Sequence, residues 1–134
     1  QNVSSTASIS MAASVEALNG DQSFISSNNE SFLRRRDQVV KHLNETPGLS
    51  CRVPEGAFYV FASCKGILGK KTESGKIIET DGDFMDYLLE EVGVAGVQGS
   101  AFGLDGFFRI SYATSDSILE DACQRIKLAC SKLS

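Results

Sequence analysis

The chain has 134 residues, of which 42% are hydrophobic and 22% are charged, and its formal net charge is −4 at pH 7. This length suffices for one hydrophobic core, and so much apolar material excludes a wholly disordered chain. The mildly acidic balance gives no long-range attraction for nucleic acid or an anionic membrane, and no apolar run is long enough to span a bilayer. We therefore expect neither a nucleic-acid nor a membrane partner.

A short helix is predicted first, over Ser8–Asn19. Its apolar residues recur at helical spacing and are Met11, Ala12, Val15 and Leu18. Asn19-Gly20 provides the stop signal. The alanine-rich face favours tight packing against another element. Because the sequence begins at Gln1 within a polar Ser/Thr-rich stretch, we expect a piece cut from a longer protein.

A second helix is predicted from about Asn29 to Asn44, with Asn28 or Asn29 as its N-cap and Pro47-Gly48 beyond its end. Phe24 and Ile25 are candidates for an earlier turn of the same helix. One face carries Phe32, Arg36, Val39, Val40 and Leu43. The sequence therefore predicts an amphipathic helix with one side against the core.

Strand signals follow. Leu49–Val53 is short and extended, and Pro54-Glu55-Gly56 predicts a tight turn in which the glycine is free to adopt a positive φ. Ala57–Ala62, with the sequence AFYVFA, is the strongest predicted strand because it is aromatic and β-branched. Being apolar on both faces, it is expected to be covered by helix on one side and by a further layer or partner domain on the other.

Residues 65–79 hold three glycines and four lysines with few apolar residues, which predicts the most mobile stretch of the chain. The spacing of its glycines does not fit the phosphate-binding P-loop pattern. Thr80 then opens a helix whose first turn contains Asp81 and Asp83, and Gly93 ends it.

The last third predicts a brief strand at Val94–Val97, a loop of small residues around one aromatic at Gly99–Gly103, and a strand at Phe107–Ala113. Ser117 and Glu120 have the spacing of a capping box for a long final helix. Helices mixed with a few strands on one small sheet predict an α/β fold of the two-layer α+β type.

Few residues are candidates for chemistry. The four cysteines, Cys51, Cys64, Cys123 and Cys130, lack metal or redox spacing and are expected to be buried free thiols in a reducing, cytoplasmic compartment. Cys123 and Cys130 are placed two turns apart on one helix face. His42 is expected to be a solvated side chain, and the basic run Arg34–Arg36 a solvated helix face beside Asp37.

Arg109 is the exception, since it lies in the middle of the apolar strand FFRISY. A guanidinium there needs an anion or several acceptors, because burying it unpaired is costly. Its planar fork suits a carboxylate. The competing interpretation is an arginine that pairs with one of the domain's own acids or points to solvent.

Four segments, taken together and in order, resemble class I pyridoxal-phosphate-dependent aminotransferases, and most closely the bacterial aspartate aminotransferases. They are PGLSCRVPEGAFYVF, VAGVQGSAFG, GFFRISYATS, and SSTASISMAASVEALNG followed by FLRRRDQVVKHLN. The resemblance covers essentially the whole chain. Gln98 departs from it, standing where proline is usual, and Met11 stands where glutamine is usual.

The resemblance implies a role for Arg109, because in that family the arginine of this strand binds the α-carboxylate of the substrate. It also implies the cofactor pyridoxal 5'-phosphate, held by a Schiff-base lysine upstream of Gln1 in the family's order. No catalytic, cofactor-binding or metal-binding residue is therefore expected in this chain. In isolation the chain is expected neither to bind the cofactor nor to be active.

The implied architecture is the small C-terminal domain of a fold-type I enzyme. Residues 1–20 would end the large cofactor domain, residues 21–46 would form the interdomain linking helix, and residues 47–134 would form the small domain. The family also implies a homodimer, with Ser4 and Ser5 near the subunit interface.

The implied reaction transfers an amino group between L-aspartate, or a related amino acid, and a 2-oxo acid, in cytoplasmic amino-acid biosynthesis. Two alternatives stay open. One is a non-enzymatic α/β module that binds a carboxylate or a partner protein. The other is an aromatic or prephenate aminotransferase on the same scaffold.

Overall fold

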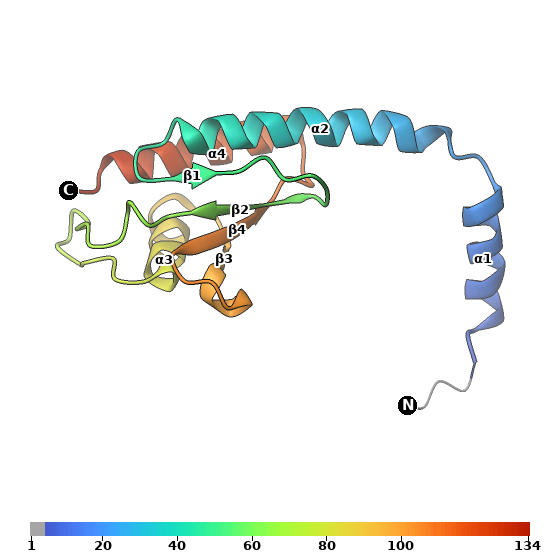
Figure 1. The fold of residues 1–134 in the computed structure, drawn as a ribbon, viewed down its shortest axis with the longest axis horizontal. Coiled ribbons are helices and arrows are strands. Elements are labelled where there is room, and N and C mark those ends of the chain that lie inside the picture. The colour runs from blue at the N-terminus through green and yellow to red at the C-terminus, as the bar shows by residue number, and fades with distance from the viewer. Residues whose placement is uncertain (1–4) are drawn as a thin grey trace. The chain divides into compact units, whose positions relative to one another are not determined.

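The computed structural model describes residues 5–134 and divides into two units, one reaching to Ser31 and one of Phe32–Ser134 (Figure 1). The elements in chain order are α1 (Ser8–Asn19), α2 (Ser23–Asn44), β1 (Ser50–Cys51), β2 (Tyr59–Ser63), α3 (Asp81–Val92), β3 (Val97–Gln98), the 3₁₀ helix η1 (Gly99–Phe102), β4 (Phe107–Ser111) and α4 (Asp116–Ser131).

The second unit is built on a four-stranded antiparallel sheet in the order β1-β2-β4-β3. Side chains alternate between its two faces. Val60 and Ala62 of β2, with Phe108 and Ile110 of β4, point into the core and are buried. The two-layer α/β fold class is therefore confirmed.

Helices cover only one face of this sheet. Phe84 of α3 meets Phe108 of β4 edge to face, with ring centroids 5.5 Å apart. Tyr87 of α3 donates a hydrogen bond of 3.0 Å from its hydroxyl to the carbonyl of Ala129 in α4. The core face of α2 contributes Val39, Val40 and Leu43, as its periodicity predicts. The side chains on the opposite face of the sheet are only half-buried.

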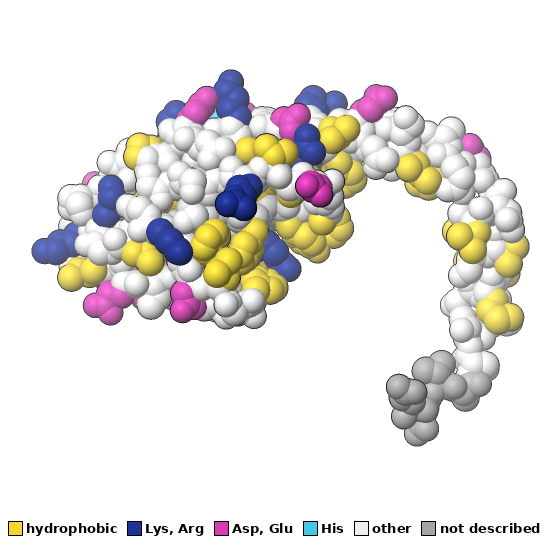
Figure 2. All heavy atoms as spheres, viewed as in Figure 1, with side chains coloured by type: hydrophobic (Ala, Val, Ile, Leu, Met, Phe, Trp, Pro, Cys, Tyr) yellow, Lys and Arg dark blue, Asp and Glu magenta, His cyan; other side chains and the backbone are white. Residues whose placement is uncertain are grey.

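The first unit contains α1 and the start of α2. The predicted bounds of α1 are confirmed, and within its own unit none of its side chains is buried. Figure 2 shows hydrophobic side chains on the surface of α1. The helix α2 begins at Ser23, where Asp21 Oδ1 accepts from the Ser23 amide at 2.9 Å. The predicted cap at Asn28 or Asn29 is therefore wrong.

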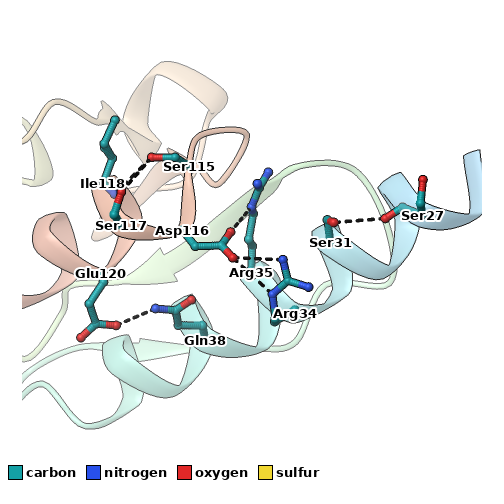
Figure 3. A network of polar contacts seen from close by, with 10 residues as sticks. All are labelled: Ser27, Ser31, Arg34, Arg35, Gln38, Ser115, Asp116, Ser117, Ile118 and Glu120. Atoms are coloured by element: carbon teal, nitrogen blue, oxygen red, sulfur yellow. Dashed lines mark hydrogen bonds and ion pairs between the residues drawn. The ribbon is translucent and has the colours of Figure 1, made fainter. Parts of the chain in front are cut away.

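Polar contacts join α2, from Phe32 onward, to α4 (Figure 3). Arg34 and Arg35 both bind the Asp116 carboxylate, and Gln38 donates to Glu120. His42 Nε2 lies 2.9 Å from Glu120 Oε2, and the histidine side chain is only 17% exposed.

The prediction of a solvated His42 is thus wrong. In the run Arg34–Arg36, Arg34 is solvated as predicted, with 59% of its side chain exposed, whereas Arg35 and Arg36 are only 23% and 21% exposed. His42, Arg34 and Arg35 find acidic partners on α4 because the two helices run side by side. Arg36 pairs with its neighbour Asp37 at 2.8 Å.

The turn before β2 differs from its prediction. Ala57, and not Gly56, adopts the left-handed conformation, with φ at 64°. The strand consequently starts at Tyr59, two residues later than predicted. The strand predicted at Val94–Val97 is displaced to Val97–Gln98, which is β3. The strand β4 begins at Phe107 as predicted but ends at Ser111, two residues before Ala113.

Two helix starts were predicted from capping residues, with different outcomes. At α3, Thr80 and Asp83 form the reciprocal capping box, and Gly93 ends the helix with φ at 67°. At α4, the Ser115 hydroxyl accepts from the Ile118 amide at 3.4 Å, so the predicted cap at Ser117 is wrong.

The segment 65–79 is better anchored than its composition suggests. Ile67 and Ile78 are completely buried, and the Lys71 amide donates to the carbonyl of Ser134 at 2.8 Å.

All four cysteines are buried free thiols, as predicted. Among the helices of residues 5–134, none is both long and apolar enough to cross a membrane.

Candidate functional site

Arg109 occupies the centre of β4, on the sheet face that no α-helix covers. Antiparallel pairing sets Phe61 of β2 and Val97 of β3 directly beside it. Because side chains alternate along a strand, Phe108 and Ile110 enter the core while Arg109 points the other way. This alternation explains how a charged residue is accommodated in so apolar a strand.

A pocket of about 200 Å³ opens at Arg109. It is lined by Tyr59, Ala95, Gly96, Val97, Arg109, Ile110 and Ser111. Arg109 is the only charged residue among them. The pocket therefore offers one guanidinium and the Tyr59 and Ser111 hydroxyls in largely apolar surroundings, which suits a small anion with an apolar body.

The guanidinium of Arg109 is held by aromatic rings. Its Cζ lies 4.5 Å from the ring centroid of Tyr59 and 4.5 Å from that of Phe102. Within residues 5–134 its side chain has no acidic partner, so the predicted alternative of pairing with one of the domain's own acids is not realised. The N–H donors of a guanidinium lie in its own plane, so contact with the rings still leaves them free to donate to a planar anion.

The element η1 supplies Phe102 and is tied to α3. The carboxylate of Asp81, only 3% exposed, accepts a 2.7 Å hydrogen bond from the Ser100 amide. A side chain at Gly99 would collide with the Leu104 carbonyl and with Phe107, so only glycine fits there. Gly103 closes the turn with φ at 79°.

Gln98 begins this turn with φ at −59° and ψ at 142°. That φ is the value a proline ring would impose. The departure from the usual proline therefore keeps the backbone shape of the turn while losing the ring that fixes it.

Reasoning from the sequence identified Arg109 but missed Tyr59, Phe102 and Asp81. The signal for Phe102 was present, since it is the one aromatic residue in a loop of small residues. Tyr59 needed the strand register, because it lies diagonally across from Arg109 on the neighbouring strand.

No lysine lines the pocket, and the nearby Lys65 lies over the Phe107 ring, with Nζ 5.2 Å from its centroid. Within the described part of the chain, no three His, Cys, Asp or Glu side chains gather as a metal site would require.

The sequence matches the family model described as "Aminotransferase class I and II" over residues 1–126. It is 61% identical over all 134 residues to an aspartate aminotransferase of Rhizobium meliloti (strain 1021), covering 33% of that protein. It is 58% identical over 130 residues, 97% of this chain, to a probable aspartate/prephenate aminotransferase of Rhizobium leguminosarum bv. phaseoli, covering 32% of it.

The fold is also similar to that of a relative with a solved structure. The crystal structure of the aspartate aminotransferase from Rhizobium meliloti superimposes with a TM-score of 0.93 at 62% identity, over 96% of this chain and 32% of that one. The chain thus spans about a third of the length of the relatives it matches. Since the family model matches nearly the whole sequence, the chain belongs to the class I and II aminotransferases.

Proposed function

We propose that this chain is the substrate-carboxylate-binding part of an aspartate aminotransferase. The complete enzyme would transfer an amino group between L-aspartate, or a related amino acid, and a 2-oxo acid. The observation that carries the proposal is the Arg109 guanidinium, which faces a small pocket without an acidic partner in residues 5–134. A substrate α-carboxylate is the anion that this arrangement lacks.

In this role Arg109 binds and orients. Two parallel N–H···O bonds from one planar fork fix both the position and the rotation of a carboxylate. Fixing the carboxylate holds Cα of the amino acid in one place, and such positioning lowers the entropic cost of reaction. The amino acid and the 2-oxo acid share this carboxylate, so one arginine serves both half-reactions.

The cofactor would be supplied by the remainder of the enzyme. The family depends on pyridoxal phosphate, and the pocket at Arg109 lacks a lysine for the Schiff base. We therefore propose that the 134-residue chain alone does not bind it, and no chemical step is assigned to residues of this chain.

We further propose the domain organisation that the family implies: residues 1–20 in the large domain, 21–46 as the linking helix, and 47–134 as the small domain. It is supported by the burial of α2 side chains only from Val39 onward. Ser4 lies outside the described residues, and Ser5 is exposed. The position of both serines near a subunit interface is part of the same proposal, as is a homodimer.

Four buried free thiols support a reducing, cytoplasmic location.

A second substrate class is favoured by one comparison. The Rhizobium leguminosarum relative is a probable aspartate/prephenate aminotransferase, so prephenate joins aspartate as a candidate amino-group partner. Assaying a full-length protein that carries this segment with aspartate, aromatic amino acids and prephenate distinguishes the two.

The test of the proposed function is a transamination assay with added pyridoxal phosphate. A full-length protein carrying this segment is expected to convert aspartate and 2-oxoglutarate, and the 134-residue chain is expected to show no turnover. Turnover by the 134-residue chain would contradict the placement of the cofactor site elsewhere. A full-length protein inactive towards every amino acid tested would contradict the proposal itself.

A further inference from the structure

The two rings around Arg109 come from separate elements and are themselves braced. Tyr59 of β2 packs on Phe58, with ring centroids 4.3 Å apart. Phe102 of η1 meets Phe61 edge to face at 6.0 Å, and Phe61 stacks on Phe107 at 5.5 Å with the planes 8° apart. The guanidinium therefore lies against surfaces that the sheet holds in place.

This arrangement restricts the arginine where it would otherwise be free. An unrestrained arginine side chain samples many rotamers and loses that entropy when a ligand fixes it in one orientation. The Cζ of Arg109 lies over both rings, 4.5 Å from each centroid, so the contacts limit how the guanidinium can turn while its N–H donors stay in its own plane. A ligand that approaches such a group meets donors that are already oriented.

We propose that Tyr59 and Phe102 are positioning residues, an aromatic clamp that presents the Arg109 fork to the substrate α-carboxylate. This inference rests on the proposed role of Arg109 and adds a separate requirement to it. The clamp acts through Arg109 and need not touch the substrate. Its effect is on binding of the carboxylate, which is present in both the ground state and the transition state.

Phe102 is the better half of the clamp to test. Its side chain is 50% exposed, and it lies at the end of η1 and outside the helical core. Replacing it therefore removes the contact with Arg109 at small cost to the fold. Leu104 provides a matched control, because it is 45% exposed and lies just beyond the same turn.

The experiment is steady-state kinetics on the full-length aminotransferase that carries this segment. Phe102→Leu is expected to raise KM for both the amino acid and the 2-oxo acid by about five-fold, the size of a cation–π contact, with kcat within about twofold. Phe102→Tyr, which keeps a ring, is expected to restore KM. Leu104→Ala is expected to match the parent protein.

A second measurement separates the charge–ring attraction from mere packing. Mono-, di- and trifluorinated phenylalanines at position 102 keep the shape of the ring while weakening the negative charge on its face, so KM is expected to rise stepwise with fluorination. If the Phe102→Leu variant fails to fold, this series still tests whether the ring at position 102 positions Arg109.

The outcomes separate the two proposals. If Arg109→Gln raises KM for both substrates while Phe102→Leu and the fluorinated series leave KM unchanged, the clamp is overturned and the role of Arg109 stands. If Arg109→Gln also leaves KM unchanged, the proposed carboxylate site fails as well.

Discussion

Arg109 shows how a charge is kept on an apolar strand without an ion pair. Burying an arginine beside an acid removes both from water, and that cost often cancels the attraction between them. Stacking on Tyr59 and Phe102 covers the weakly hydrated faces of the guanidinium and leaves its donors accessible. An anionic ligand, as proposed for Arg109, would therefore not have to compete with a neighbouring carboxylate within residues 5–134.

The buried thiols make stability sensitive to alkaline pH. Burial raises the pKa of Cys51, Cys64 and Cys123 to about 11, and that of Cys130 to about 12, from the ordinary value of 9.0. Above pH 9 the unfolded thiols lose protons that the native thiols keep. The unfolded state then binds fewer protons, so the free energy of unfolding falls as pH rises towards 11, by at most about 1.4 kcal/mol per pH unit and thiol.

Urea unfolding of the 134-residue chain between about pH 8 and about pH 10.5 measures this slope. The variant Cys130→Ala, with one titrating thiol removed, is expected to be less stable at neutral pH but to lose stability less steeply with pH. Identical slopes for the two proteins would argue against a raised pKa at Cys130.

Patterns in the sequence predicted the structural features that depend only on residues close together in the chain. Burial of the four thiols and the start of α3 at Thr80 both follow from local pattern. The partners of His42 did not, because Glu120 reaches it only when α2 and α4 lie side by side. The ring of Phe102 over Arg109 likewise depends on how η1 folds back, which no local pattern specifies.

Among the elements, the start of α4 offers a paired test of helix capping. Ser115 caps the helix, whereas Ser117, two residues later, lies within its first turn. Ser115→Ala is expected to lower the free energy of unfolding by about 1 kcal/mol, and Ser117→Ala by much less. Chemical denaturation of both variants checks this, and a larger loss for Ser117→Ala would contradict the observed cap.

Element boundaries were harder to predict than element types. Every predicted helix exists, yet α2 starts six residues before Asn29, and β2 starts two residues after Ala57. The reason at β2 is that Ala57 adopts a positive φ, which residues other than glycine rarely do. The reason at α2 is that Asp21 binds the Ser23 amide and so begins the helix earlier.

At the scale of the whole molecule, α1 is a helix whose apolar side chains are exposed in its own unit. Ile9 and Leu18 are 83% and 80% exposed, and Met11 and Val15 are more than half exposed. Exposed apolar patches of this kind promote association. The 134-residue chain is therefore expected to self-associate, with a sedimentation coefficient that rises with protein concentration.

Replacing both Ile9 and Leu18 by serine is expected to weaken this association. Leu128→Ser is the matched control, since Leu128 on α4 is 56% exposed but lies away from α1 in the sequence. If the chain sediments as a monomer at every concentration, the exposed apolar side chains of α1 do not cause self-association.

The central claim is that Arg109 binds the α-carboxylate of both substrates, and kinetics of the full-length enzyme test it most directly. Arg109→Gln is expected to lower kcat/KM by at least about 30-fold for the amino acid and for the 2-oxo acid alike, since it removes one partner of a charged pair. Arg109→Lys, which keeps the charge but lacks the planar fork, is expected to lie in between. Cofactor absorbance should be unchanged in both variants. Parent-like kcat/KM for both substrates in Arg109→Gln would contradict the claim.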